Sequence, residues 1–164
     1  MKPITLLFKT AFPAACAIVL FGLITWQLRR LDPYIPIAFP AWMVLAGIVL
    51  GVAGAMLAFV CFALFAIGGS LTPGPSFPDP NVFVDVGPYR YVRNPMAVGL
   101  LAALVGWSFF QRSVSDLLLA LLVIALMHAL IVFVEEPKLE RRFGQSYLTY
   151  KRRVGRWIPG LRIR

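Results

Sequence analysis

A polar, aromatic and cationic segment, residues 87–99, stands between two long apolar runs. It contains Arg93, whose paired N–H donors suit a carboxylate or a phosphate, and Tyr89, whose ring can contact another ring. Roughly forty residues later an apolar run ends in Glu135 and Glu136, which can face a cationic group. These groups can bind a small molecule that carries charged groups and a ring.

The one histidine, His128, is predicted to lie about two turns before Glu135 on roughly the same helix face, where it offers a base or a hydrogen-bond donor. A hydrogen-bonded structural role is the alternative, although a polar residue inside a membrane span is a functional candidate. The alternative for Arg93 is snorkelling to lipid headgroups. The alternative for the two glutamates is to cap the following helix or to pair with Arg141 and Arg142.

The composition indicates an integral membrane protein. Of 164 residues, 60% are hydrophobic and only 14% are charged, and the mean hydropathy is +0.80, outside the usual range for a soluble domain. Cys16 and Cys61 lie inside apolar runs, so a disulfide framework is not expected. The net charge of +9 collects at the ends of apolar runs and after Pro137, which favours anionic lipid headgroups over nucleic acid as partners.

The predicted fold is all-α, one membrane domain over residues 1–164, with four transmembrane helices and an interfacial C-terminal helix. The expected spans are residues 11–28, 41–67, 96–110 and 114–134. The first is read as an uncleaved span. The third is only about 22 Å long as a helix, against a hydrocarbon core of about 30 Å. It forms a helical hairpin with the fourth, and whether it crosses fully is open.

Two further segments complete the predicted architecture. Residues 68–95 are rich in proline and glycine and are expected to form a binding loop. Residues 137–154 are expected to form one amphipathic helix in the membrane interface, because apolar side chains recur along them at helical spacing. Folding of this helix under the bundle is the alternative. Gly47 and Gly51 share a helix face, which predicts packing against the first span or, alternatively, homodimerisation.

The distribution of cations predicts the orientation in the membrane. Four spans place both termini, the loop and the C-terminal tail on one side, with Lys2, Lys9, Arg90, Arg93 and the nine cations of the tail. The other side holds Arg29, Arg30 and Arg112. The positive-inside rule then makes the first side cytosolic in a bacterial-type inner membrane. The candidate site would therefore face the cytosol.

The segment and the glutamate pair resemble the signature of the isoprenylcysteine carboxyl methyltransferase and phospholipid methyltransferase superfamily. That signature reads Arg-His-Pro-x-Tyr-x-Gly, a hydrophobic run, then Glu-Glu. The matching residues are Arg93, Pro95, Gly99, Glu135 and Glu136, while Asn94 replaces the His and Ala97 replaces the Tyr. The resemblance extends over residues 81–159 and includes a later Phe-Gly-x-x-Tyr-x-x-Tyr pattern that ends at Tyr150.

The resemblance implies an S-adenosylmethionine-dependent methyltransferase that needs no metal and acts on a lipophilic acceptor entering between helices. It assigns cofactor binding to Asn81, Val82, Phe83, Val84, Tyr89, Arg93, Asn94, Pro95, Gly99 and Glu136. The candidate catalytic residues are Glu135, Arg93 and His128, with Glu135 beside the reacting acceptor.

The sequence leaves the acceptor and two other functions open. The prenylcysteine enzymes carry an Arg where this chain has Ile131, which counts against a prenylcysteine carboxylate substrate. The sequence does not distinguish carboxylate, amine and thiol acceptors. An NADPH-dependent membrane reductase of the sterol-reductase type is one alternative function. A non-catalytic membrane subunit, which would bind neither cofactor, is the other.

Overall fold

The structure is a computed structural model that describes residues 20–35, 37, 39–70 and 86–160. The named elements in these residues are all helices and include no strand, which confirms the all-α prediction for this part of the chain. After a helical stretch at residues 20–28, the elements are η1 Arg29–Tyr34, α2 Met43–Ser70, η2 Gly87–Arg90, α3 Pro95–Phe110, α4 Val114–Leu130, η3 Ile131–Glu135, α5 Glu136–Phe143 and α6 Gln145–Arg153. The predicted first span falls partly, and the predicted Asn81–Val84 stretch wholly, outside the described residues.

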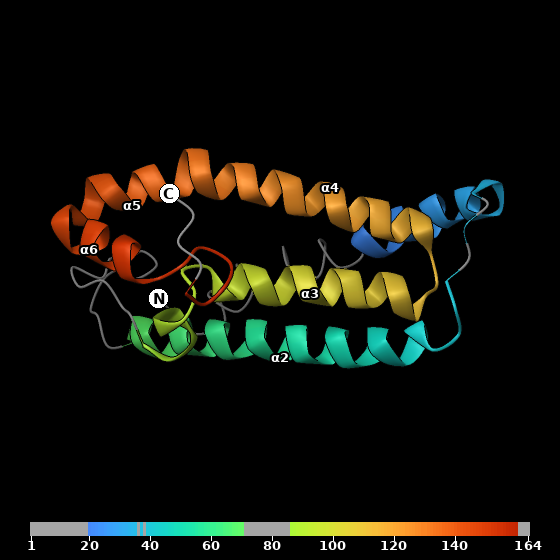
Figure 1. Cartoon of the computed structure of the whole chain (residues 1–164), viewed down its shortest axis with the longest axis horizontal. Coiled ribbons are helices and arrows are strands. Elements are labelled where there is room, and N and C mark those ends of the chain that lie inside the picture. The colour runs from blue at the N-terminus through green and yellow to red at the C-terminus, as the bar shows by residue number, and fades with distance from the viewer. Residues whose placement is uncertain (1–19, 36, 38, 71–85, 161–164) are drawn as a thin grey trace, which may run out of the picture.

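Helices α2 and α3 lie side by side because glycines line their contact (Figure 1). A Cβ atom added at Gly54 would lie 2.5 Å from the carbonyl oxygen of Gly99, and one added at Gly47 would lie 2.6 Å from that of Gly106. Only a residue without a side chain permits this approach. The prediction that the Gly47 and Gly51 face packs against the first span was therefore wrong, because α3 covers it. A homodimer through this face would have to displace α3.

Helices α4, η3 and α5 form one continuous rod, and η3 is a single turn of wide π-helix in its middle. The amide of Glu136 donates to the carbonyl of Ile131, five residues back. Pro137 has no amide hydrogen, and its ring would crowd the carbonyl four residues earlier, which explains the wider turn. The expectation that a helix ends at the two glutamates was wrong: they lie inside the rod, which continues to Phe143.

A chain reversal at Gly144 divides the predicted helix over residues 137–154 into α5 and α6. Gly144 has φ of 52° and ψ of −128°, a conformation that side chains disfavour. Beyond it, α6 folds back so that Tyr147, Tyr150 and Val154 are buried against Leu139 and Phe143. The apolar stripe therefore forms a small core of the protein. Its predicted role as a membrane-facing surface is wrong for these residues.

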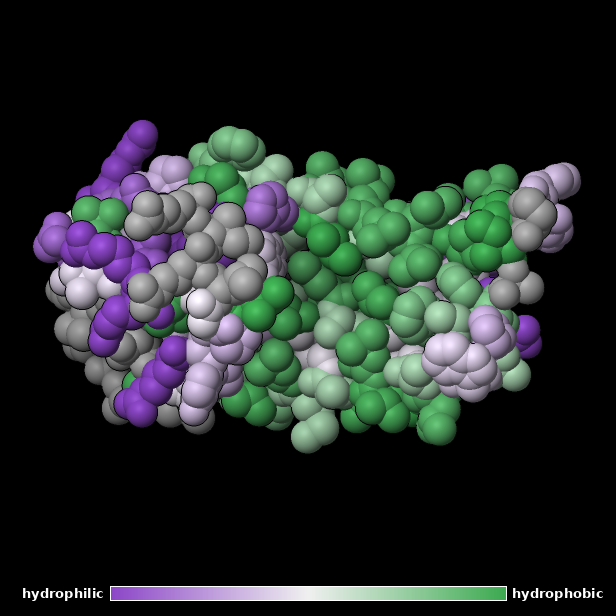
Figure 2. Space-filling view, viewed as in Figure 1, coloured by the Kyte–Doolittle hydropathy of each residue, from purple (hydrophilic) through white to green (hydrophobic). Residues whose placement is uncertain are grey.

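Two helices of the described part are long and apolar enough to cross a membrane, Met43–Leu64 and Val114–Phe143, and the 16-residue α3 is shorter. Figure 2 shows the apolar surface as a broad belt and hydrophilic residues gathered at the end that holds α5 and α6. At the opposite end, Arg29 forms an ion pair with Asp116, 3.1 Å between Nε and Oδ2, and joins η1 to α4. This arrangement of an apolar belt with hydrophilic residues at the end is typical of an integral membrane protein.

Candidate functional site

The turn that precedes α3 is held by a strand-like segment from the far end of the chain. Val92 forms a parallel bridge with Gly155, and the Arg93 amide donates to the Gly155 carbonyl at 2.8 Å. The Asn94 side chain donates to the Arg156 carbonyl at 3.5 Å. Pro95 then begins α3 at a position where its missing N–H costs little. The segment that follows α6 therefore positions Arg93 and Asn94.

Tyr89 is tied to the same region. Its carbonyl accepts a 2.7 Å hydrogen bond from the Tyr150 hydroxyl. Burial, the neighbouring Cys61 thiol and the negative charge of Glu135 together raise the pKa of Tyr89 to about 12. Tyr89 is therefore a neutral phenol at physiological pH, and Glu135 lies close enough to the η2 turn to affect its ionisation.

Glu136 is the centre of a buried ionic cluster. Its carboxylate accepts two hydrogen bonds from Arg156, at 2.6 Å from Nε and 3.1 Å from Nη2, and lies 2.9 Å from Nη1 of Arg93 and 3.1 Å from Nζ of Lys151. Lys151 also contacts Glu140 at 2.6 Å. Three cations thus face two carboxylates, so the cluster keeps an excess of positive charge that suits an anionic ligand group.

Arg93 brings unused hydrogen-bond donors to this cluster. Its side chain is 4% exposed, yet among the described residues its Nε and Nη1 atoms make no well-directed hydrogen bond. The 2.9 Å approach of Nη1 to Glu136 compensates charge but is poorly aligned for a bond. Buried donors of this kind normally have a partner. The sequence predicted that Arg93 binds a carboxylate or a phosphate, and the carboxylate of S-adenosylmethionine would suit these donors.

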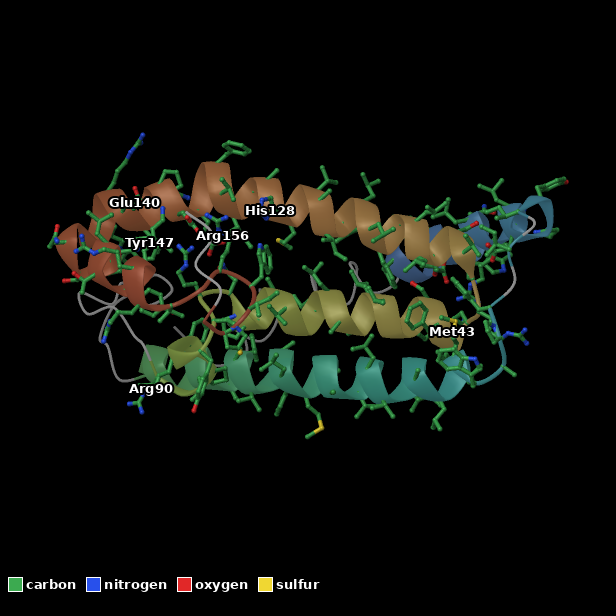
Figure 3. The ribbon with its side chains drawn as sticks, viewed as in Figure 1. Met43, Arg90, His128, Glu140, Tyr147 and Arg156 are labelled. Carbon is green, nitrogen blue, oxygen red and sulfur yellow. The ribbon has the colours of Figure 1, made fainter. Side chains whose placement is uncertain are left out.

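Neighbouring groups reinforce the cluster. The hydrogen bond to Glu140 and the contact with Glu136 hold the pKa of Lys151 above its usual value, and the bond to Glu136 does the same for Arg156. Burial raises the pKa of Tyr147, and a hydrogen bond from Arg93 opposes that rise. The tyrosine hydroxyl therefore remains protonated beside the guanidinium. Figure 3 shows Tyr147, Glu140 and Arg156 gathered at this end of the molecule.

His128 lies apart from the ionic cluster, beside an apolar pocket. The indole Nε1 of Trp157 donates to His128 Nδ1 at 3.0 Å. The pocket between α3 and α4 has a volume of about 390 Å³ and is lined by Leu101, Leu121, Ile124, Ala125, His128 and Trp157. A larger hollow of about 620 Å³ lies at the opposite end of the molecule, beside Asp32 and Arg112, and has no contact with the predicted site residues.

The structure thus brings together Tyr89, Arg93, Asn94 and Glu136 through the fold-back of α6 and the segment after it. Gly99 lies on the α3 face that packs against α2, where an added Cβ would be 2.7 Å from the Ala58 amide nitrogen. Residues 81–84 lie outside the described part of the chain.

Sequence reasoning missed three site residues and one structural feature. The residues are Lys151, Arg156 and Trp157, and the feature is the π turn. The signal for the π turn was the proline directly after the glutamate pair. The sequence pattern of the C-terminal tail showed cations and an apolar stripe, but it did not indicate which residues Lys151, Arg156 and Trp157 would contact.

Comparison with known proteins identifies a matching family and a solved structure with a similar fold. The family model for phospholipid methyltransferases matches residues 42–146. The solved structure of a eukaryotic intramembrane Ras methyltransferase, an isoprenylcysteine carboxyl methyltransferase, has the same fold with a TM-score of 0.66 at 20% sequence identity. That similarity covers 89% of this chain and 53% of the other, so this chain spans about half of its length.

No curated protein sequence matches the chain significantly. The family match, by contrast, extends over well more than half of the sequence and includes α2, α3, α4 and the whole of α5. It therefore contains both the turn before α3 and the two glutamates. The chain belongs to the phospholipid methyltransferase family.

Proposed function

We propose that the protein is an S-adenosylmethionine-dependent methyltransferase that acts on a lipophilic acceptor at the membrane. The observation that carries the proposal is the buried Arg93 guanidinium, which has unused donors within a positively charged cluster. S-adenosylmethionine, when bound, supplies an electrophilic methyl group on a sulfonium centre. Transfer of this methyl group is an in-line displacement, so the chain's main task is to position the two reactants.

The two glutamates take different roles in this proposal. Glu136 is 3% exposed and is engaged by three cations, so it orders Arg93 and Arg156. Glu135 is exposed and lies near Tyr89. Glu135 is therefore the carboxylate that can approach the ammonium group of the cofactor or accept a proton from the acceptor. Tyr89 and Asn94, which flank Arg93, would contact the rest of the cofactor.

The proposed orientation places this site at the cytosolic surface. The hydrophilic end contains the turn before α3, the ionic cluster and exposed cations of α5 and α6 such as Arg141 and Arg152. Anionic headgroups of the inner leaflet would attract those cations, at about 1 kcal/mol for each one near the surface. The cofactor would then enter from the cytosol, while the acceptor enters laterally from the bilayer.

The test is calorimetric titration of the purified protein in nanodiscs with S-adenosylmethionine, S-adenosylhomocysteine and NADPH. Arg93→Lys keeps the charge but loses the paired donors, so its affinity for S-adenosylmethionine should fall about tenfold or more. Arg152→Lys, at an exposed site on α6, is the matched control and should bind normally. Preferential binding of NADPH would support a reductase, and binding of no cofactor by folded protein would support a non-catalytic subunit.

Turnover requires a second assay, because the acceptor is not identified. Incubation with S-adenosylmethionine labelled in its methyl group and a total lipid extract should transfer the label to an organic-phase product. Glu135→Gln should abolish transfer and leave the protein folded, because Glu135 is exposed and its loss opens no buried contact. Unchanged transfer would remove Glu135 from the mechanism.

A further inference from the structure

His128, the only histidine of the 164-residue chain, is held in one tautomer by a hydrogen bond from Trp157. An indole N–H can donate a hydrogen bond but cannot accept one. The 3.0 Å bond from Trp157 Nε1 therefore requires His128 Nδ1 to be an unprotonated acceptor. In a neutral imidazole the single proton then lies on Nε2. This tautomer is arranged to donate a hydrogen bond from Nε2, so it favours the donor role of His128 over the general-base role.

The remaining N–H of His128 needs a partner. His128 is exposed and lies in a rod that is long and apolar enough to cross a membrane. A polar N–H in such surroundings costs free energy unless it is hydrogen-bonded. Trp157 is the residue that bonds His128 among those the structure describes, and it occupies only Nδ1. The N–H at Nε2 is thus left for a ligand.

The residues around His128 indicate the chemistry of this ligand. Four aliphatic side chains of α3 and α4 line the pocket of about 390 Å³ in which His128 and Trp157 are the polar members. Trp157 directly follows Arg156, which bonds Glu136, so the chain connects this pocket to the ionic cluster. An apolar tail can fill the pocket, while an oxygen next to the tail accepts the bond from His128.

We propose that Trp157 fixes His128 as an Nε2–H donor that recognises a carboxylate or phosphate oxygen of a lipophile whose tail occupies the pocket between α3 and α4. The identification of this lipophile as the methyl acceptor rests on the proposed function. Trp157 is a positioning residue, because it acts through His128. The preferred acceptor class then carries an anionic oxygen, and lipophilic amines without such an oxygen bind more weakly.

The experiment uses ¹⁵N-histidine NMR on the full chain in nanodiscs, purified without a histidine tag so that His128 gives the only imidazole signal. The expected spectrum shows protonated Nε2 and unprotonated Nδ1. Trp157→Phe should give a mixture of the two tautomers. Trp107→Phe, whose ring packs against Phe110 on α3, is the matched control and should leave the spectrum unchanged. A protonated Nδ1 in the unmodified protein would overturn the proposal without relying on any variant.

The ligand class is tested by titrating decanoate, decyl phosphate and decylamine into the same sample. Decanoate or decyl phosphate should shift the Nε2 resonance, and the difference between them identifies which oxygen is preferred. Decylamine should shift it at least tenfold less at equal concentration. An equal shift with decylamine, or no shift with any of the three, would overturn the proposal. Calorimetry with S-adenosylmethionine on this sample separates failure of this inference from failure of the proposed function.

Discussion

Arg156 and Glu136, twenty residues apart, form a two-pronged ion pair with N–O distances of 2.6 and 3.1 Å. The pair closes the fold-back of α6 onto the rod and orders the buried Arg93. Glu136→Gln should therefore lower the free energy of unfolding by about 3 kcal/mol or more, since it leaves buried cations uncompensated. Glu135→Gln, one residue earlier and exposed, should change it by less than about 0.5 kcal/mol. Chemical denaturation in detergent measures both variants, and equal stability would contradict the central role of Glu136.

Packing of α2 on α3 depends on Gly54. A Cβ at this position would lie 2.5 Å from the Gly99 carbonyl oxygen and 2.6 Å from the Ala103 amide nitrogen. Because these are backbone atoms, Gly54→Ala should push the helices apart and cost about 1–3 kcal/mol. Gly22→Ala is the control, since no atom lies within 4 Å of the added methyl group. A Gly54→Ala protein as thermostable as the Gly22→Ala protein would exclude this close packing.

The chain reversal requires glycine at position 144 for its backbone conformation and not for close packing. An added Cβ meets no atom within 4 Å, but φ of 52° with ψ of −128° suits only glycine. Gly144→Ala should therefore destabilise the fold-back by about 1–3 kcal/mol. Limited proteolysis should show faster cleavage between α5 and α6 than in the unchanged protein. Identical cleavage rates would indicate that the chain does not reverse at this residue.

The hydrogen bond from the Tyr150 hydroxyl to the Tyr89 carbonyl links α6 to the turn before α3. Tyr150→Phe should cost about 1 kcal/mol of stability and should weaken binding of S-adenosylmethionine, because the turn that presents Arg93 is less well ordered. Tyr34→Phe, at a residue that is 84% exposed, is the control for both measurements. Normal cofactor affinity in Tyr150→Phe would show that this bond supports the fold only.

At the end of the molecule away from α5 and α6, Asp32 should make the stability of the protein depend on pH. Its carboxylate accepts a 2.9 Å bond from the Ser115 amide at the start of α4. Burial raises the pKa of Asp32, but bonds from Ser115 and Ser113 outweigh it and lower that pKa below 3.8. Its contribution to stability is therefore complete above pH 3.8 and is lost as the pH falls through the lower folded-state pKa. Melting temperatures of the protein and of Asp32→Asn should differ at neutral pH and converge in acid.

The sequence by itself determined the features that depend on local composition. The apolar runs predicted membrane helices because span length and hydropathy need no tertiary contact. The apolar run over residues 96–110 predicted α3, which the structure begins one residue earlier, at Pro95. The Arg93, Pro95, Gly99 and glutamate spacing predicted the family that the comparisons then showed.

Only the tertiary structure decided which residues meet. The reversal at Gly144 brings Arg156 to Glu136 and Trp157 to His128, contacts between residues twenty and twenty-nine apart. A periodic apolar stripe is the same whether its helix lies in the membrane interface or folds back, so the pattern could not reveal this. The two adjacent glutamates are likewise alike in sequence. Adjacent residues on a helix point in different directions, and only the fold-back of α6 decides that Glu136 meets Arg156 while Glu135 stays exposed.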